Sequence, residues 1–273
     1  MRLPSLLAWS LRLDYDFFAE VTGLRAGEKV RLILLKYLTP LAARMRRGGA
    51  ASTALLGGRY HYADPTGIAS LQRVFCSSHG LREFLPRNPV VVDVGANVGQ
   101  FHFFARQYLH ARRIVSIEPL PECHDVLRRN VSSGEDCVNC AVSCAEGEVV
   151  FHEAEQSQLS SCVVDEGVAV RKTRTVPCRS LDSILAERHI EHVDLLKIDT
   201  EGTELDVLRS AEATLARTGA VYVEMSVFRK ATGTFFQIGT FLEERGFRLV
   251  DLTVGSRRRP KDMDALFLKT IAP

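Results

Sequence analysis

The fold follows from one stretch of the chain, Val90-Val-Val-Asp-Val-Gly-Ala-Asn-Val-Gly-Gln-Phe101. Its apolar run has no polar alternation, which is typical of a strand buried on both faces of a parallel sheet. Gly95 and Gly99 allow a sharp turn and a close approach of the backbone to a ligand, and Asn97 also tolerates a positive φ. The amides at the start of the following helix favour an anionic group. The stretch therefore predicts a ligand site at the carboxyl end of a buried strand.

A second acidic position indicates what kind of ligand this is. The strand-like run Arg113–Ile117 ends at Glu118-Pro119, and Glu118 lies 25 residues after Asp93. An acidic residue there can accept hydrogen bonds from both ribose hydroxyls of a nucleoside. The two motifs together predict a nucleoside cofactor.

The glycine spacing selects among such cofactors, because it differs from the Gly-x-Gly-x-x-Gly of dinucleotide folds. The carboxylate of Asp93 suits an ammonium group, and the helix amides suit a carboxylate. S-adenosylmethionine carries both groups at its methionine end and a ribose at the other. We therefore predict an adenosylmethionine site. A nicotinamide or flavin site and a glycine turn that only packs helix against strand remain alternatives.

Strand and helix patterns alternate through most of the chain. We expect strands at 89–94, 113–117, 136–142, 193–199 and 219–225, and a final hairpin of 247–252 and 264–269. Helices are expected at 98–109, 121–130, 180–188, 203–217 and 234–245. This order predicts an α/β fold with a doubly wound, mostly parallel seven-stranded sheet and one antiparallel strand. Two further strands, 148–152 and 173–176, are expected at the edge of an insertion.

The first 50 residues differ from the rest. We predict a helical arm at 1–50, a catalytic domain at 51–273 that begins with a glycine hairpin, and a hinge at Gly48-Gly49. The arm holds nine Lys/Arg against four acids, a balance of +5, so that the remaining chain carries −3 of the net +2. An apolar stripe recurs at helical spacing in Val30, Ile33, Leu34, Tyr37, Leu38 and Leu41. We favour packing on the catalytic domain or a second copy, with an anionic membrane surface as the alternative.

Cysteine usage bears on the compartment. Seven cysteines in 273 residues do not form an even disulfide framework, which favours a reducing cytoplasm. Cys137, Cys140 and Cys144 lack a fourth metal ligand at a recognisable spacing, and we interpret them as small apolar residues rather than a metal site. No run is long enough to span a bilayer, and the stretch 3–11 lacks a signal-peptide cleavage site. A cytoplasmic protein is expected, with the inner face of the membrane as an additional location if the arm binds lipid.

Charged residues gather where the later strands end. Lys197 and Asp199 lie two residues apart on one strand and so project to the same side, and the next strand ends in Glu224. Because ligands of such sheets bind outside the carboxyl ends of the strands, Asp93, Asp199 and Glu224 are expected to share one crevice. Like charges there raise at least one pKa, which favours a general base or a cation site. Glu201 and Glu204 have a second interpretation, as favourable charges at a helix N-terminus.

These motifs closely resemble the FkbM family of class I methyltransferases. The resemblance rests on Asp93-Val-Gly-Ala-Asn-Val-Gly-Gln-Phe101, Glu118-Pro119, Ser180-Leu-Asp-Ser183, Leu196-Lys-Ile-Asp-Thr-Glu-Gly-Thr-Glu204 and Val223-Glu224, in the family's order. It covers about residues 55 to 250 and leaves out the arm. It implies adenosylmethionine-dependent O-methylation, often of a hydroxyl on a sugar, glycolipid or polyketide-type product. The predicted cofactor residues are Asp93, Gly95, Asn97, Gly99, Glu118, Pro119 and Ala141, and no metal ligand is predicted.

For the reaction we expect an in-line displacement with a carboxylate base. Asp199 is the first candidate and Glu224 the second, with Lys197 orienting them, while Glu201 serves if the acceptor approaches from the helix side. The expected partner is a small-molecule or lipid-linked saccharide acceptor. An RNA methyltransferase, a nicotinamide-dependent oxidoreductase and a non-catalytic binding module are the competing hypotheses. The basic loop Arg257-Arg258-Arg259, with Lys261, is either a solvated hairpin tip or a site for a phosphate or acidic sugar.

Overall fold

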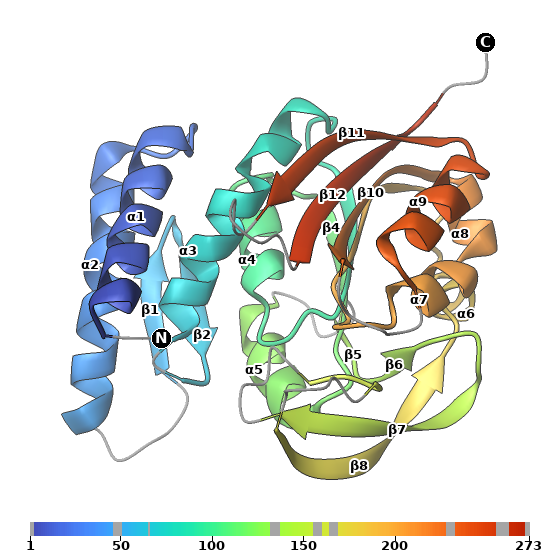
Figure 1. Ribbon diagram of the computed structural model, residues 1–273, viewed down its shortest axis with the longest axis horizontal. Coiled ribbons are helices and arrows are strands. Elements are labelled where there is room, and N and C mark those ends of the chain that lie inside the picture. Colours follow the sequence, from blue (N-terminus) through green and yellow to red (C-terminus); the bar gives the residue numbers. More distant parts are fainter. Residues whose placement is uncertain are drawn as a thin grey trace.

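A seven-stranded sheet forms the centre of the computed structural model, which describes residues 3–45, 51–64, 66–131, 137–154, 160–163, 169–227, 233–254 and 262–270. The strands run in the order β11-β12-β10-β9-β3-β4-β5 (Figure 1). Their bounds are β3 Val90–Val94, β4 Arg113–Ile117, β5 Cys137–Val138, β9 Val193–Ile198, β10 Thr218–Ser226, β11 Phe247–Val254 and β12 Asp262–Lys269. The two pairs that β12 makes, with β10 and β11, are antiparallel, and the other adjacent strands of this sheet are parallel. The predicted doubly wound sheet with one antiparallel strand is confirmed.

Helices cover both faces of this sheet because its central strands are apolar on both sides. Alternate residues of β3 belong to different clusters: Val92 packs with the helices of one layer and Val91 with those of the other. The first layer holds α6 Leu181–Glu187, α7 Glu204–Arg209, α8 Glu212–Ala216 and α9 Phe235–Glu243. The second holds α3 Gly67–Ser78 and α4 Gln100–Gln107, with α5 Pro121–Asn130 near the β5 edge and a short 3-10 helix at His79–Glu83. The layers leave the carboxyl ends of the parallel strands open for a site.

The predicted strand 136–142 is wrong in one respect, because the chain leaves the main sheet after Val138. The Asn139 side chain donates to the carbonyl oxygens of Glu118 and Pro119 at 2.8 and 3.0 Å, which holds the chain in a bend. The following residues, β6 Ala141–Val142, join a second sheet of order β6-β8-β7 with β7 Gly147–Ala154 and β8 Val170–Arg179. The two strands predicted for an insertion are therefore the larger part of a separate three-stranded sheet.

The predicted helix 203–217 is also divided, into α7 and α8. The carboxylate of Asp182, on α6, accepts from the backbone amides of Ala213 and Thr214 at 2.9 and 2.7 Å. It thereby caps the start of α8, which favours a new helix over the continuation of α7. The Ser210 hydroxyl, at the break, donates to the Val207 carbonyl at 2.7 Å.

The N-terminal arm is a pair of helices, α1 Leu3–Glu20 and α2 Ala26–Met45, and α3 separates it from the sheet (Figure 1). The hairpin of β1 Ala51–Leu55 and β2 Gly58–Tyr62 follows, as predicted. The arm buries Phe17, Val21 and Leu32 in the same cluster as α3 and α4. The expected packing of α2 on the catalytic domain is confirmed, and Ile33 of the predicted stripe takes part in it. Most of the contact is made by another side of the helix, where Leu32, Lys36 and Thr39 are buried. The other described members of the stripe are exposed, namely Val30, Leu34, Tyr37 and Leu38. The predicted hinge at 48–49 and the loop at 257–261 lie outside the described residues.

A buried polar network fixes the arm. Asp14 accepts hydrogen bonds from Lys36 at 2.5 Å, from Tyr37 at 2.5 Å and from Gln72 of α3 at 2.8 Å. Burial alone would raise the pKa of Asp14, but the hydrogen bonds, that of Lys36 foremost, lower it below its ordinary value. Both charged groups are almost fully enclosed, so each depends on the other for compensation.

We expect Asp14→Ala to lower the free energy of unfolding by about 3 kcal/mol, because it leaves the buried Lys36 charge uncompensated. Asp16→Ala is the matched control on the same helix: its pair with Arg12 is exposed and should contribute less than about 1 kcal/mol. Urea unfolding of both variants measures the difference. Equal losses would show that the Asp14 network does not hold the arm.

Candidate functional site

A cavity of about 340 Å³ lies outside the carboxyl ends of β3, β4, β9 and β10, and the three-stranded sheet and α3 complete its wall. This is the position at which open α/β sheets bind ligands, and the volume suits a small molecule. Asp93 and Gly99 are not among its lining residues. The structure brings together the other nine predicted site residues, which are Gly95, Asn97, Glu118, Pro119, Ala141, Lys197, Asp199, Glu201 and Glu224.

The glycine loop has the predicted backbone. Gly95, Asn97 and Gly99 have φ angles of 82, 48 and 92°, in the left-handed region where glycine and asparagine are least strained. A Cβ on Gly95 would lie 1.8 Å from the carbonyl oxygen of Asp199. Glycine is therefore required there by the close approach of the loop to the end of β9, in addition to any ligand.

The amides of this loop are used within the protein. Gly95 and Ala96 donate to the Ile117 carbonyl, both at 3.0 Å, and Gly99 donates to the Ala96 carbonyl at 2.8 Å. The amide of Asn97 donates to the Glu118 carboxylate at 2.8 Å. An anionic group of a ligand would therefore be met by the first turn of α4, whose residues Gln100 and Phe101 line the cavity.

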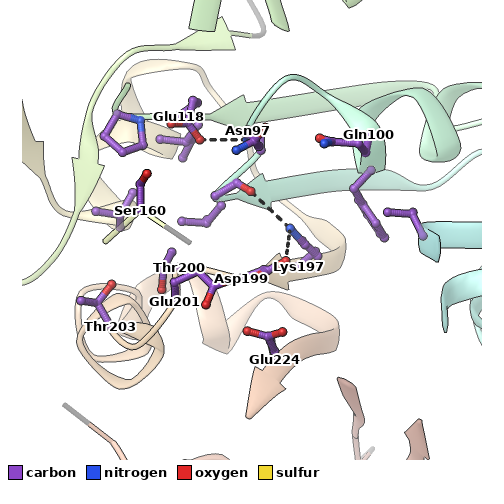
Figure 2. Close-up of a pocket in the computed structure, with 18 of the residues that line it drawn as sticks. Asn97, Gln100, Glu118, Ser160, Lys197, Asp199, Thr200, Glu201, Thr203 and Glu224 are labelled. Carbon is purple, nitrogen blue, oxygen red and sulfur yellow. Dashed lines mark hydrogen bonds and ion pairs between the residues drawn. The ribbon is translucent and has the colours of Figure 1, made fainter. Parts of the chain in front are cut away.

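Glu118 connects the glycine loop to the end of β4 (Figure 2). Its carboxylate also accepts from the Leu120 amide at 2.9 Å, and burial raises its pKa to about 7. Each carboxylate oxygen has a further lone pair, so that Glu118 can also accept from ribose hydroxyls in the cavity. Beside it lies an apolar wall that suits a nucleobase, formed by Ile117, Pro119, Ala141, Val142 and Phe151.

Lys197 lies between two carboxylates. Its Nζ is 3.4 Å from Asp199 Oδ2 (Figure 2). It is also 3.2 Å from Asp93 Oδ1 and donates to the Gly95 carbonyl at 3.4 Å. Burial alone would lower the pKa of Lys197, but the two carboxylates outweigh it and raise that pKa above its ordinary value. Asp93 is 0% exposed, so the structure corrects its predicted role: it holds Lys197 from inside instead of facing a ligand. The Asp199 side chain is 38% exposed and faces the cavity.

Carboxylates dominate the opposite end of the cavity. Oxygens of Asp199, Glu201 and Glu224 lie within 4.8 Å of one another, an arrangement that could hold a cation. Burial, and then the charge of Asp199, raises the pKa of Glu224 well above its ordinary value. Asp264 is paired with Glu224 across the strands, and burial followed by the Asp199 charge raises its pKa to about 6. This end can take up and release a proton near neutral pH.

Sequence reasoning missed Asp262 and Asp264, which also line this end. The pairing of the final hairpin with β10 would have revealed them, because it places Asp264 opposite Glu224. Glu204 has a structural position instead: it accepts from the amides of Thr200 and Gly202 at 3.1 and 2.9 Å and so shapes the loop that carries Glu201.

The cysteines are mostly buried. Cys137 and Cys140 are buried, whereas Cys144 is exposed and its thiol donates to the Asp206 carbonyl at 3.6 Å. Cys140 and Cys162 line the cavity, and burial raises the pKa of each thiol to about 12. These two thiols are therefore neutral at physiological pH and form part of the apolar wall.

Comparison with known proteins agrees with this geometry. The model of the methyltransferase FkbM domain matches residues 93–249. The chain belongs to the FkbM methyltransferase family. It is 30% identical over 199 residues to methyltransferase sdnD of Sordaria araneosa, covering 60% of this chain and 75% of that one. It is 27% identical over 158 residues to 2-O-methyltransferase NoeI of Sinorhizobium fredii, covering 51% and 64%. A crystal structure of methyltransferase FkbM from Methylobacillus flagellatus is 13% identical, with a TM-score of 0.45 over 93% of this chain and 60% of that one.

As an FkbM methyltransferase, this chain is an enzyme that uses S-adenosylmethionine, so the nicotinamide oxidoreductase and the non-catalytic module are excluded. The cavity fits this cofactor. Glu118 and the apolar wall around it would hold the ribose and adenine, and the first turn of α4 would hold the carboxylate of the methionine end.

The pKa of Glu118 predicts how cofactor affinity depends on pH. The ionised carboxylate is the form that accepts from ribose hydroxyls, and its pKa is about 7, so affinity should fall as the pH drops from 8 to 6, by at most about tenfold per pH unit. Glu118→Gln should weaken binding by about 1.5–3 kcal/mol and abolish this dependence. Calorimetric titration with adenosylmethionine measures both effects.

Glu122→Gln is the matched control, since Glu122 is the exposed partner of Arg174 and does not line the cavity. It should keep the affinity and pH profile of the unaltered protein. If Glu118→Gln also kept this affinity and pH profile, Glu118 would not be part of the cofactor site.

Proposed function

We propose that this methyltransferase acts on a hydroxyl group of a sugar, glycolipid or secondary-metabolite acceptor, with Asp199 as the general base. One observation carries the proposal: Asp199 is a partly exposed carboxylate at the cavity end opposite Glu118, and an ion pair with the buried Lys197 fixes its position. A carboxylate held in this way is suited to remove a proton from a hydroxyl.

The residues around Asp199 support oxygen as the accepting atom. A hydroxyl has a high pKa, and a base within hydrogen-bond reach accelerates its reaction by about 10²–10⁴. The relative NoeI is named a 2-O-methyltransferase, and that name agrees with a hydroxyl acceptor. The loop 199–203 also has no proline or aromatic residue that could stack on a nucleobase.

The protein's part in the reaction is mainly alignment and proton transfer. Bound adenosylmethionine supplies an activated methyl group on a sulfonium. Lys197 orients Asp199 through one carboxylate oxygen and leaves the other free of that ion pair to face the acceptor. Orientation of this kind can supply up to roughly 7–11 kcal/mol of the barrier. The raised pKa of Glu224 favours its protonated form. In that form Glu224 can donate a hydrogen bond to the acceptor before Asp199 removes the proton of the acceptor hydroxyl.

The charge of the cavity limits which kinds of acceptor can enter it. Five carboxylates line its acceptor end: Asp199, Glu201, Glu224, Asp262 and Asp264. The buried Lys197 is already paired, and Arg73 of α3 is the other cationic residue among the lining residues. A phosphodiester backbone would be repelled here, which disfavours RNA. We therefore propose that the part of the acceptor that enters the cavity is a neutral polyol, in a free or lipid-linked saccharide.

Asp199→Asn keeps the shape of the side chain and removes its charge. We expect kcat to fall at least about 10²-fold, with the affinity for adenosylmethionine little changed, because the base is lost and the cofactor end is intact. Steady-state kinetics and calorimetry separate the two quantities. Asp251→Asn, on the exposed β11 and outside the cavity, is the control and should retain full activity.

Activity of Asp199→Asn within a few-fold of the unaltered enzyme would contradict the assignment of the base. Glu201→Gln and Glu224→Gln, measured in parallel, would then show which acid takes the role. Loss of activity on addition of a chelator, with recovery on Mg²⁺, would show instead that these acids are metal ligands.

A further inference from the structure

The arm exposes an unusual number of apolar side chains. Seven of the fifteen large apolar residues that are exposed in the described part of the chain lie on α1 and α2. We call this set the outer face: Leu11 55%, Tyr15 71%, Phe18 45%, Val30 46%, Leu34 55%, Tyr37 41% and Leu38 54% exposed. Isolated exposed apolar residues are common, but a group of this size on one pair of helices indicates a contact surface.

These residues form one continuous face. On α1 they recur at i, i+4 and i+7, and on α2 at i, i+4, i+7 and i+8, so each set lies on one side of its helix. The two sides meet where the helices touch. Tyr37 donates to Asp14 at 2.5 Å, and the Lys29 ammonium lies 5.5 Å from the centre of the Phe18 ring.

The outer face cannot be buried by a rotation of the arm. The opposite side of the helix pair carries Phe17, Val21 and Leu32 in the core, and the Asp14 network fixes it to α3. Exposure of the outer face is therefore a property of the folded protein.

Charge indicates what covers this face. The exposed residues Arg12 and Arg31 follow Leu11 and Val30 in the chain and so lie at its borders. Of the four acids, Asp14 is enclosed, Asp16 pairs with Arg12, Glu28 accepts from the Arg25 amide at 2.9 Å, and Glu20 is exposed. Residues 1–50 carry +5 and the rest of the chain −3. An apolar face with a cationic border is complementary to an anionic lipid surface, in which it can lie flat.

We propose that the outer face docks the enzyme on an anionic membrane. Tyr15, Phe18 and Tyr37 are of the types that are favoured at the boundary between headgroups and acyl chains. The Lys29 ammonium group, which donates to the Phe18 carbonyl at 2.8 Å, places a positive charge beside them. Docking in the plane of the surface also agrees with the length and polarity of the arm, since none of the described helices is long and apolar enough to cross a membrane. The proposal does not depend on the identity of the acceptor.

Flotation of the full-length protein with vesicles tests the proposal. Vesicles of phosphatidylcholine with phosphatidylglycerol should bind the protein, and pure phosphatidylcholine should bind it much more weakly. Leu34→Glu/Leu38→Glu should reduce binding at least about tenfold, because two apolar side chains no longer enter the lipid. Phe236→Glu is the matched control, on α9 and 79% exposed, and should bind as the unaltered protein does. Arg12→Gln/Arg31→Gln should reduce binding to the anionic vesicles, and more so at low salt.

Each of these positions is exposed, so the variants should fold, and thermal unfolding verifies this. Equal binding of both vesicle types, or no effect of the double glutamate variant on binding, would overturn the proposal. Sedimentation without lipid distinguishes the main alternative occupant. A dimer that Leu34→Glu/Leu38→Glu dissociates would show that the outer face joins two copies of this chain, which also overturns the proposal.

Discussion

The site depends on the two ion pairs that the Lys197 ammonium group makes, with Asp93 and with Asp199. A lysine in the interior of a central strand is costly to bury, and removing one partner of such a group is strongly destabilising. Here two carboxylates compensate it, one fully buried and one at the edge of the cavity. The charge of Lys197 thus fixes Asp199 in one place, which suits the role of base that we propose for it.

The same contact links the two ends of the cavity. Lys197 also donates to the carbonyl of Gly95, and the glycine loop packs so closely on the end of β9 that no Cβ fits. Glu118 then fixes the other side of the loop through the amide of Asn97. The residues that we propose for the cofactor and those that we propose for the acceptor are therefore held by one connected set of polar contacts. Replacement of Lys197 itself, which removes its contacts with Asp93, Asp199 and Gly95 together, should therefore disturb both ends.

Much of this could be predicted from the sequence, since its strongest signals are local. The strand and loop at 90–99 and the order of strands follow from apolar runs and from residues that allow positive φ. Features that depend on contacts between distant parts of the chain could not be predicted. The break after Val138 depends on a side chain that bonds to a different strand end, and the division of α7 from α8 depends on Asp182 of another helix.

Prediction from the sequence is limited in the same way for the site and for the arm. The sequence alone predicts that Asp93 faces a ligand, because the spacing of residues along the chain does not show that Lys197 lies beside it. Asp264 cannot be predicted because Glu224, its partner across the strands, lies 40 residues away in the chain. On α2 most of the apolar stripe is exposed, although Ile33 packs against the core. Lys36 faces inward because the Asp14 carboxylate accepts from its ammonium group, and Gln72 of α3 donates to the same carboxylate.

Transfer of a methyl group to an acceptor oxygen is tested most directly by isotope labelling. The full-length enzyme would be incubated with adenosylmethionine carrying a ¹³C-methyl group and with saccharide and glycolipid fractions of a cell extract. The carbon chemical shift of the product then identifies the atom that received the methyl group. The proposed function predicts an O-methyl signal on a neutral saccharide. Label found on nitrogen or carbon, or only on RNA, would contradict it.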